Sequence, residues 1–285
     1  MSLSTQLLII DPQNDFCDLP AAWCPADPVH AGTMAPALPV PGAHADMLRL
    51  AAFVTAAGER LDDITITLDS HNRLHIAHPT FWQRGDGAEV QPFTPITARQ
   101  VRGGQFRPRD PQALSRALDY LDALESRGRY TLMVWPVHCE IGSWGHGVHP
   151  ALRAAYNAWE VRELKVVRKV TKGTNLWTEH YSALQAEVPD PADPATLPDQ
   201  ALLAALDRAG RLIIAGEAGS HCVKATTEDL ADLLPGGAPE RLVLLTDCMS
   251  PVSGFERQHE DFLRRMAERG ARLATSTEVL QELLA

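Results

Sequence analysis

The stretch AGEAGSHCVKATTED, residues 215–229, places Cys222 between a strand-like apolar run and a helix-like segment. A cysteine at such a turn lies near free backbone N–H groups and the positive end of a helix dipole, and both favour the thiolate form. The position of Cys222 therefore makes it a candidate nucleophile. A nucleophilic thiol also needs a neighbouring group that accepts its proton.

Asp11 is a candidate for that proton acceptor. It ends the apolar run of LLIIDPQNDF, and Pro12 turns the chain directly after it. A carboxylate at a strand end can serve as a base or an acid toward a thiol. An aspartate that only caps the turn fits the same pattern equally well.

The segment DSHNRLHIAH, residues 69–78, contains residue types that bind metals. Asp69 and His71 are two positions apart, so at a strand end their side chains project in the same direction. A turn can then bring His75 or His78 close to them. A carboxylate with imidazoles suits a Zn²⁺ or Fe²⁺ site that keeps one position open. A polar loop with solvated histidines is the equal alternative.

His138 lies in WPVHCEIGSWGHGVHP, residues 135–150, and is the candidate for a third metal ligand. The Trp-Pro pair before it fixes a rigid turn. His146 and His149 in the same segment are interpreted as surface or structural residues, and Cys139 as a buried packing residue.

A group of basic residues follows in KVVRKVTKGTN, residues 165–175. A lysine before a glycine, in a loop after a strand, can hold a nearby carboxylate ionised and orient it. The residue pattern alone favours the other interpretation, a single solvated basic strip made of Lys165, Arg168, Lys169 and Lys172.

Short apolar runs alternate with longer helical patterns, and these elements must position the candidate residues. The predicted strands are Leu7–Ile10, Ile64–Leu68, Tyr130–Trp135, Glu163–Val167, Arg211–Ala215, Leu242–Thr246 and Arg272–Ala274. The predicted helices are His44–Ala57, Pro111–Arg127, Pro198–Ala209, Val223–Leu234, Phe255–Glu268 and Thr277–Leu284. This alternation predicts a doubly wound α/β fold, with a mostly parallel sheet of about six strands and helices on both faces. Ligands bind beyond the carboxyl ends of such strands, where the candidate residues lie.

We expect a single domain spanning residues 1–285, because no internal repeat or clear linker is present. Two irregular regions interrupt the pattern: residues 18–42, which are rich in proline, and residues 79–110, which are too long for an ordinary connection. The second region and the helix after it are predicted to form an inserted, lid-like segment, about 79–130, or an oligomer contact.

The composition narrows the range of functions. A formal charge of −10 without a basic cluster argues against a nucleic-acid or anionic-membrane surface. Five cysteines without a CxxC pair indicate no disulfide framework, so a cytoplasmic location is expected. The first residues lack the features of a signal peptide, and no apolar stretch approaches the roughly 20 residues of a membrane span.

Together, these stretches resemble the nicotinamidase and isochorismatase-like family of cysteine hydrolases. The matching motifs are, in order, LLIIDPQNDFCD (7–18), LDSHNRLH (68–75), WPVHC (135–139), TKG (171–173) and GEAGSHCVKATTED (216–229). Each motif is weak by itself. Five motifs in the right order and spacing, covering most of the chain up to about residue 250, are specific for the family.

The resemblance implies a catalytic triad of Asp11, Lys172 and Cys222. Cys222 would attack the carbonyl carbon of an amide, Asp11 would carry the thiol proton to the leaving amine, and Lys172 would keep Asp11 ionised. Backbone N–H groups of Ala218 and Cys222 would form the oxyanion hole, and the family's cis peptide would fall at Glu217–Ala218. The products would be an acid and ammonia.

The resemblance also implies a divalent metal that positions the substrate, namely zinc, or else iron or manganese. Its ligands would be Asp69, His71 and His138. His75 occupies the position of a further histidine that some members of the family use.

Two aromatic residues and two departures from the family concern the substrate. Phe16 and Trp135 match positions that sandwich an aromatic substrate ring. Many members have a Thr-Asp pair where this chain has Gly-Ser in the GSH of residues 219–221, which alters the oxyanion loop. The 79–130 segment lengthens the gap before WPVHC, and an insertion there would reshape the rim of the pocket.

Three functions are consistent with these residues. The first is a nicotinamidase-like thiol amidohydrolase that acts on a small-molecule amide, as a homo-oligomer. The second is an amidase of the carbamoylsarcosine or ureidoacrylate type, which often lacks a full metal set, so a bound metal would argue against it. The third is a catalytically silent binding protein, which ammonia release lost in Cys222→Ala would exclude. Cys222 also favours amide cleavage over vinyl-ether cleavage, because members that hydrolyse isochorismate lack this cysteine.

Overall fold

The computed structural model describes residues 4–235 and 238–285. Its centre is a six-stranded sheet in which all neighbouring strands are parallel, in the order β10-β9-β8-β1-β2-β7. These strands are β1 (Thr5–Ile10), β2 (Asp63–Asp69), β7 (Arg168–Lys172), β8 (Arg211–Gly216), β9 (Leu242–Leu245) and β10 (Arg272–Ala274). The predicted α/β class and the parallel sheet of about six strands are confirmed.

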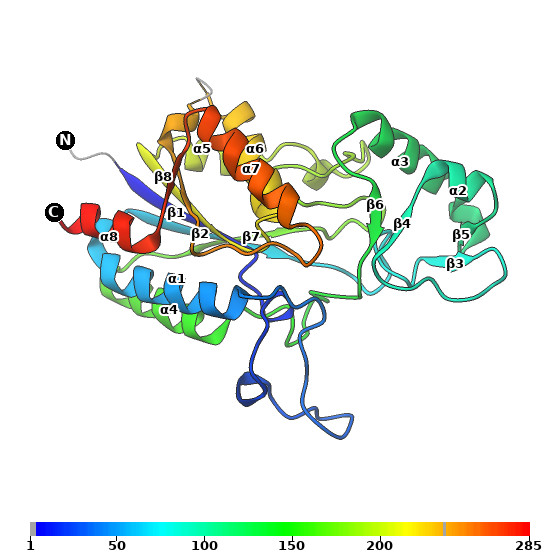
Figure 1. The fold of residues 1–285 in the computed structure, drawn as a ribbon, viewed down its shortest axis with the longest axis horizontal. Helices are drawn as coiled ribbons and strands as arrows, with labels where there is room; N and C mark the ends of the chain where they lie inside the picture. The colour runs from blue at the N-terminus through cyan, green and yellow to red at the C-terminus, as the bar shows by residue number, and fades with distance from the viewer. Residues whose placement is uncertain (1–3, 236–237) are drawn as a thin grey trace.

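Helices cover both faces of this sheet (Figure 1). One face carries α1 (Ala43–Ala57), α4 (Pro150–Glu163) and α8 (Ser276–Leu284), and the other carries α5 (Gln200–Leu206), α6 (Cys222–Leu233) and α7 (Glu256–Glu268). Every residue of β1 is buried, because this strand lies in the middle of the sheet between two helical layers. Its run TQLLII ends in four consecutive apolar residues, as is typical of a strand buried on both faces.

Four neighbouring strands bring the candidate catalytic residues together. The order β8-β1-β2-β7 places their carboxyl ends side by side, and β2 and β7 are in register at Asp69 and Lys172. Asp11 follows β1, and Cys222 begins α6 after β8. The site therefore forms at the carboxyl-terminal ends of the parallel strands, where ligands bind in such folds.

Two predicted strands are placed wrongly. The predicted strand Glu163–Val167 does not exist, because the preceding residues form α4 and the edge strand β7 begins only at Arg168. The apolar residues of α4 recur at helical spacing, a pattern that the sequence interpretation overlooked. The predicted strand Tyr130–Trp135 shrinks to β6 (Leu132–Val134), which pairs with β4 outside the main sheet.

The 79–130 segment lies to one side of the main sheet (Figure 1). It contains β3 (Trp82–Arg84), β4 (Thr94–Ile96), β5 (Phe106–Pro108), α2 (Ala98–Arg102) and α3 (Leu114–Arg127). β3 pairs antiparallel with β5, and β4 pairs antiparallel with β6.

Arg129 attaches the end of this segment to α6. It donates hydrogen bonds to Asp229 Oδ1 at 2.9 Å and to Ala225 O at 3.0 Å. Both acceptors belong to the helix that begins at Cys222, so the 79–130 segment is attached to the same helix that carries the candidate nucleophile. All five cysteines are free thiols, and no helix among residues 4–235 and 238–285 is long and apolar enough to cross a membrane.

Candidate active site

Cys222 is the first residue of α6 and is almost completely buried. The expected cis peptide is present at Glu217–Ala218. Across the described residues, we find no backbone acceptor for the N–H groups of Ala218 and Cys222, so both can donate to an oxyanion. Gly216 permits the turn before them, because a Cβ at this position would lie 2.1 Å from Ile10 O and its φ is +118°.

Lys172 is buried, although the residue pattern alone favoured a solvated strip. Arg168 and Lys169 are exposed as that interpretation requires, but Lys172 is only 3% exposed and points into the protein. Gly173 follows at φ +82°, where a Cβ would come within 2.8 Å of His71 Cε1. The lysine–glycine pair therefore allows the chain to pass close to the histidine.

The ammonium of Lys172 joins the two carboxylates and the thiol. Its Nζ lies 2.9 Å from Asp11 Oδ2 and 3.0 Å from Asp69 Oδ1. It also donates a hydrogen bond to His180 O at 2.9 Å, and Cys222 Sγ is 3.6 Å away. The three residues of the predicted triad thus lie together in the interior, with Asp69 as a fourth member.

Thr67 holds the carboxylate of Asp11 in place. The Thr67 hydroxyl donates to Asp11 Oδ1 at 2.5 Å and accepts the Asp11 N–H at 3.0 Å, while Oδ2 faces Lys172. Burial raises the pKa of Asp11 above its ordinary value, more than the ammonium of Lys172 lowers it. A raised pKa makes this carboxylate a stronger base than an aspartate at the surface.

The charges of the centre divide into two pairs. Burial raises the pKa of the Cys222 thiol well above its usual range, although Lys172 opposes the increase. Burial also disfavours the ionised forms of Asp69 and Lys172, but their partners outweigh it, so the pKa of Asp69 is lowered and that of Lys172 is raised. Asp69 and Lys172 are therefore fixed charges, and Asp11 and Cys222 are the pair between which a proton can move.

Two imidazoles converge on Asp69 beside this centre. Asp69 Oδ2 lies 2.9 Å from His71 Nε2 and 3.3 Å from His138 Nε2. The Nδ1 atoms of the same rings face Gly173 O at 3.0 Å and Pro136 O at 2.8 Å. Carbonyl and carboxylate oxygens only accept hydrogen bonds, so each ring needs either two protons or a metal ion at Nε2.

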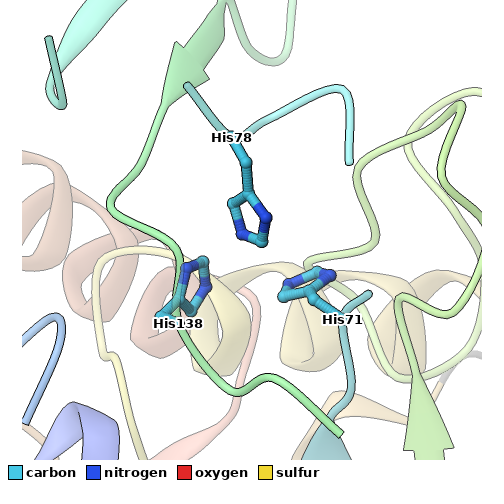
Figure 2. Close-up of side chains that lie close together, drawn as sticks. All are labelled: His71, His78 and His138. Carbon is cyan, nitrogen blue, oxygen red and sulfur yellow. The ribbon is translucent and has the colours of Figure 1, made fainter. Parts of the chain in front are cut away.

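His78 completes this histidine cluster (Figure 2). Its Nε2 is buried without a hydrogen-bond partner among the described residues, while its Nδ1 faces Arg73 O at 3.3 Å. One ring nitrogen from each of His71, His78 and His138 lies within 4.8 Å of the others, and the rings point toward one another. A divalent cation fits this arrangement, because it would bind the unpaired nitrogen and replace buried protons. Imidazole and carboxylate donors suit Zn²⁺ or Fe²⁺.

His75, expected as an optional ligand, has both ring nitrogens engaged elsewhere. Its Nδ1 accepts the Ala77 N–H at 3.2 Å, and its Nε2 faces Thr178 O at 3.2 Å. The geometry therefore favours His78 over His75 as the additional histidine. The spacing left both open, and the turn between His71 and His78 brings the ring of His78 into the cluster with His71 and His138.

A narrow cavity connects the thiol with the histidine cluster. It leaves about 20 Å³ for the centre of a water molecule, and it is lined by Phe16, Leu38, Asp69, Trp135, His138, Glu179, Tyr181, Ala218, His221, Cys222 and Val252. Both aromatic residues expected to sandwich a substrate ring, Phe16 and Trp135, belong to this lining. A cavity of this size holds about one water molecule, so a ring-sized substrate can enter only if the walls move.

Glu179 is a lining residue that the sequence interpretation missed. Its Oε1 accepts the His180 N–H at 3.0 Å, and its Oε2 is buried without a hydrogen-bond partner in the described structure. Burial raises the pKa of Glu179, and the charge of His71 opposes this increase. The free oxygen can bind a metal ion or a substrate N–H group. Glu179 lies in an irregular loop, where no periodic pattern could have indicated it.

No protein-family model matches the sequence, and a search of curated proteins also finds no match. Solved structures do match. The nicotinamidase and pyrazinamidase of Acinetobacter baumanii is 17% identical with a TM-score of 0.62, covering 98% of this chain and 99% of that one. The fold is that of the nicotinamidases.

Two further structures support this likeness. The yeast nicotinamidase bound to the inhibitor nicotinaldehyde is 18% identical with a TM-score of 0.61, covering 95% of this chain and 99% of that one. The pyrazinamidase of Pyrococcus horikoshii in complex with zinc is also 18% identical, with a TM-score of 0.51 and the same coverage. The resemblance predicted from five short motifs is thus confirmed as a likeness of fold over nearly the whole chain.

Proposed function

We propose that the protein is a nicotinamidase-like thiol amidohydrolase, which cleaves a small carboxamide to a carboxylic acid and ammonia through a thioester on Cys222. One observation carries this proposal. The buried ammonium of Lys172 lies 2.9 Å from Asp11 and 3.6 Å from the sulfur of Cys222, and Cys222 lines the cavity. A thiol, a base and a fixed cation in such contact are the parts that acyl transfer requires.

In the first half of the reaction, Asp11 takes the proton of the Cys222 thiol and the sulfur attacks the carbonyl carbon of the amide. The carbonyl oxygen becomes an oxyanion, which accepts hydrogen bonds from the N–H groups of Ala218 and Cys222. One donor of this kind contributes about 2.7–4 kcal/mol. The C–N bond then breaks, Asp11 gives its proton to the nitrogen, and ammonia leaves behind a thioester.

In the second half, water enters the place that ammonia has left. Asp11, now ionised again, takes a proton from the water, and the oxygen of that water attacks the thioester carbonyl. The C–S bond breaks, the acid leaves, and the proton on Asp11 returns to the sulfur. Lys172 keeps its charge throughout, so it stabilises both the carboxylate and the thiolate.

We propose that Nε2 of His71, His78 and His138, together with the Asp69 carboxylate, would hold a divalent metal such as zinc or iron. Such an ion would polarise and orient a lone pair of the substrate or of water beside the thiol. The chain's own residues support this assignment, because carbonyls hold the Nδ1 side of each ring and leave Nε2 for a ligand. The zinc complex of the similar Pyrococcus horikoshii pyrazinamidase agrees with it.

The histidine cluster also helps to distinguish a metal-assisted, nicotinamidase-like amidase from one of the carbamoylsarcosine or ureidoacrylate type. An amidase of the carbamoylsarcosine or ureidoacrylate type often lacks a full metal set, whereas this chain buries an unpaired His78 nitrogen beside two further imidazoles. A buried polar atom without a partner is costly, and metal binding would remove that cost. We therefore favour the metal-assisted type.

The test is ammonia release from a panel of small amides, including nicotinamide and pyrazinamide, by the metal-loaded protein. We expect turnover of at least one amide, and a loss of at least about 10³-fold in Cys222→Ala. Cys24→Ala is the matched control, because Cys24 is a free thiol in the 18–42 region that does not line the cavity. The proposal fails if no amide is hydrolysed, or if Cys222→Ala retains the activity of Cys24→Ala.

A further inference from the structure

Beyond the reaction itself, we infer that His221 selects the substrate by donating a hydrogen bond from its Nε2–H to an acceptor atom on the amide. This inference rests on the proposed function and deepens it. It defines the substrate class as small, planar amides that carry a ring nitrogen, carbonyl or similar acceptor besides the carboxamide.

The position of the proton on His221 follows from Ser220. The Ser220 hydroxyl accepts the Val252 N–H at 3.0 Å, and the same oxygen lies 2.9 Å from His221 Nδ1. Ser220 is almost fully buried, so its hydroxyl proton needs an acceptor, and Nδ1 is the one within reach in the described structure. Nδ1 therefore accepts, and the proton of the neutral ring lies on Nε2.

The ring of His221 belongs to the wall of the cavity. It lies against Trp135, Tyr181 and Phe255, with ring centroids 5.1, 5.3 and 4.6 Å apart. No hydrogen bond to Nε2 is found among the described residues, and Nε2 is not one of the fully buried unpaired atoms. Nε2 thus keeps its donor free for a partner, on a ring that lines the same cavity as Cys222.

The surroundings keep this donor neutral. Burial, together with the nearby Lys224 ammonium, lowers the pKa of His221 to about 3. An uncharged N–H on an apolar wall favours amides that can accept its hydrogen bond. An amide without an acceptor would leave this N–H buried and without a partner, which weakens binding. A site built in this way rejects the analogue that lacks the polar atom far more strongly than the analogue that lacks a methyl group.

The experiment compares nicotinamide with benzamide, in which a C–H replaces the ring nitrogen, on wild type, His221→Phe, His221→Asn and Ser220→Ala. The quantity is the ratio of the two kcat/KM values. We expect wild type to favour nicotinamide by roughly tenfold to a hundredfold. His221→Phe should lower this ratio at least about tenfold, His221→Asn should restore part of it through its amide N–H, and Ser220→Ala should lie between.

A metal that binds the ring nitrogen would also favour nicotinamide, so the same ratios are measured after removal of metal. The inference holds if His221→Phe lowers the ratio with and without metal. It fails if the ratio stays the same in His221→Phe, or if both amides lose activity equally, since a structural role alone would act on both. The absence of any amide hydrolysis would instead contradict the proposed function. Calorimetric binding of both amides to Cys222→Ala tests His221 in that case.

Discussion

The strand-end cluster of Asp11, Asp69, Lys172 and Cys222 and the histidine cluster of His71, His78 and His138 lie next to each other but differ in how complete they are. In the strand-end cluster, the charges are paired: Lys172 lies within 3.0 Å of both carboxylates. In the histidine cluster, two rings face only acceptors and one buried nitrogen has no partner among the described residues.

This difference follows from what builds each cluster. The first stands on the ends of four adjacent parallel strands, whose register is fixed by the sheet. The second stands on turns after β2 and β6, which are joined by one isolated β-bridge between His71 and Glu140 and not by a pair of full strands. The strand-end cluster is thus ready for chemistry by itself, whereas the histidine cluster needs a ligand to satisfy it. Asp69 contacts both clusters, but the other residues should respond differently to mutation: those of the strand-end cluster in rate, and those of the histidine cluster in metal affinity.

The largest difference between the two clusters is expected from Asp11→Asn, which should reduce the rate and leave metal binding unchanged. Without a carboxylate, no group takes the thiol proton, so kcat should fall by roughly 10²–10⁴-fold. The metal content measured by atomic emission should stay at the wild-type level, because Asp11 is not in the histidine cluster. Asp86→Asn, at an exposed position of the 79–130 segment, is the control and should keep full activity. Loss of metal in Asp11→Asn would show that the clusters are not separable.

His78→Ala is expected to have the opposite effect. It removes the unpaired nitrogen, so affinity for Zn²⁺, titrated by calorimetry, should fall by about 10- to 100-fold or more. The thiol should still react with iodoacetamide at the wild-type rate, since Cys222, Asp11 and Lys172 are untouched.

His75→Gln is the comparison for that variant. Both nitrogens of His75 have partners within the fold, so its replacement should change Zn²⁺ affinity much less than His78→Ala does. Equal losses of affinity in the two variants would contradict the assignment of His78 as the ligand.

A smaller effect, about tenfold in kcat, is expected from Thr67→Val, which frees one oxygen of the Asp11 carboxylate. The pH dependence of activity should also change, in a direction that follows from the pKa of Asp11. Asp11 must be ionised to act as base, and burial raises its pKa, so activity should fall with decreasing pH at a midpoint above that of an ordinary aspartate. The Thr67 hydroxyl stabilises the charged form, so Thr67→Val should move this midpoint to still higher pH. Thr67→Ser should restore it, and an unchanged midpoint would remove Thr67 from the account.

The smallest effect is expected from Phe16→Leu, at the border between the two clusters. The Phe16 ring lies 5.4 Å from that of His138 and lines the cavity. Losing an aromatic contact of about 0.5–1.5 kcal/mol should raise KM by roughly two- to tenfold and leave kcat nearly unchanged. A drop in kcat with constant KM would mean that Phe16 acts on the chemistry and not on binding.

The strand-end cluster was largely predictable because its residues follow apolar runs. Asp11 and Asp69 come directly after a strand-like pattern, Cys222 follows another one across a short turn, and parallel strands bring such ends together. Lys172 was not predictable in this way. Its neighbours Arg168 and Lys169 are exposed, and only the match to a family motif distinguished it from them.

The remaining errors concern turns and one overlooked helix. The pattern of α4 was overlooked, and a strand was predicted at Glu163–Val167 although β7 begins only at Arg168. The choice between His75 and His78 depends on backbone turns after β2, which spacing does not specify. Glu179 lines the cavity because of the path of the loop after β7. A single acidic residue in a loop carries no local sequence signal, so this position was not predictable.

The central claim is that Cys222 carries the acyl group, and mass spectrometry of the reaction quenched in acid within the first turnover tests it most directly. After digestion, the account predicts that the peptide containing Cys222 gains the mass of the acyl part of the amide, and that this gain is absent in Cys222→Ala. Turnover with no acylated peptide, or with the acyl group on another residue, would contradict it.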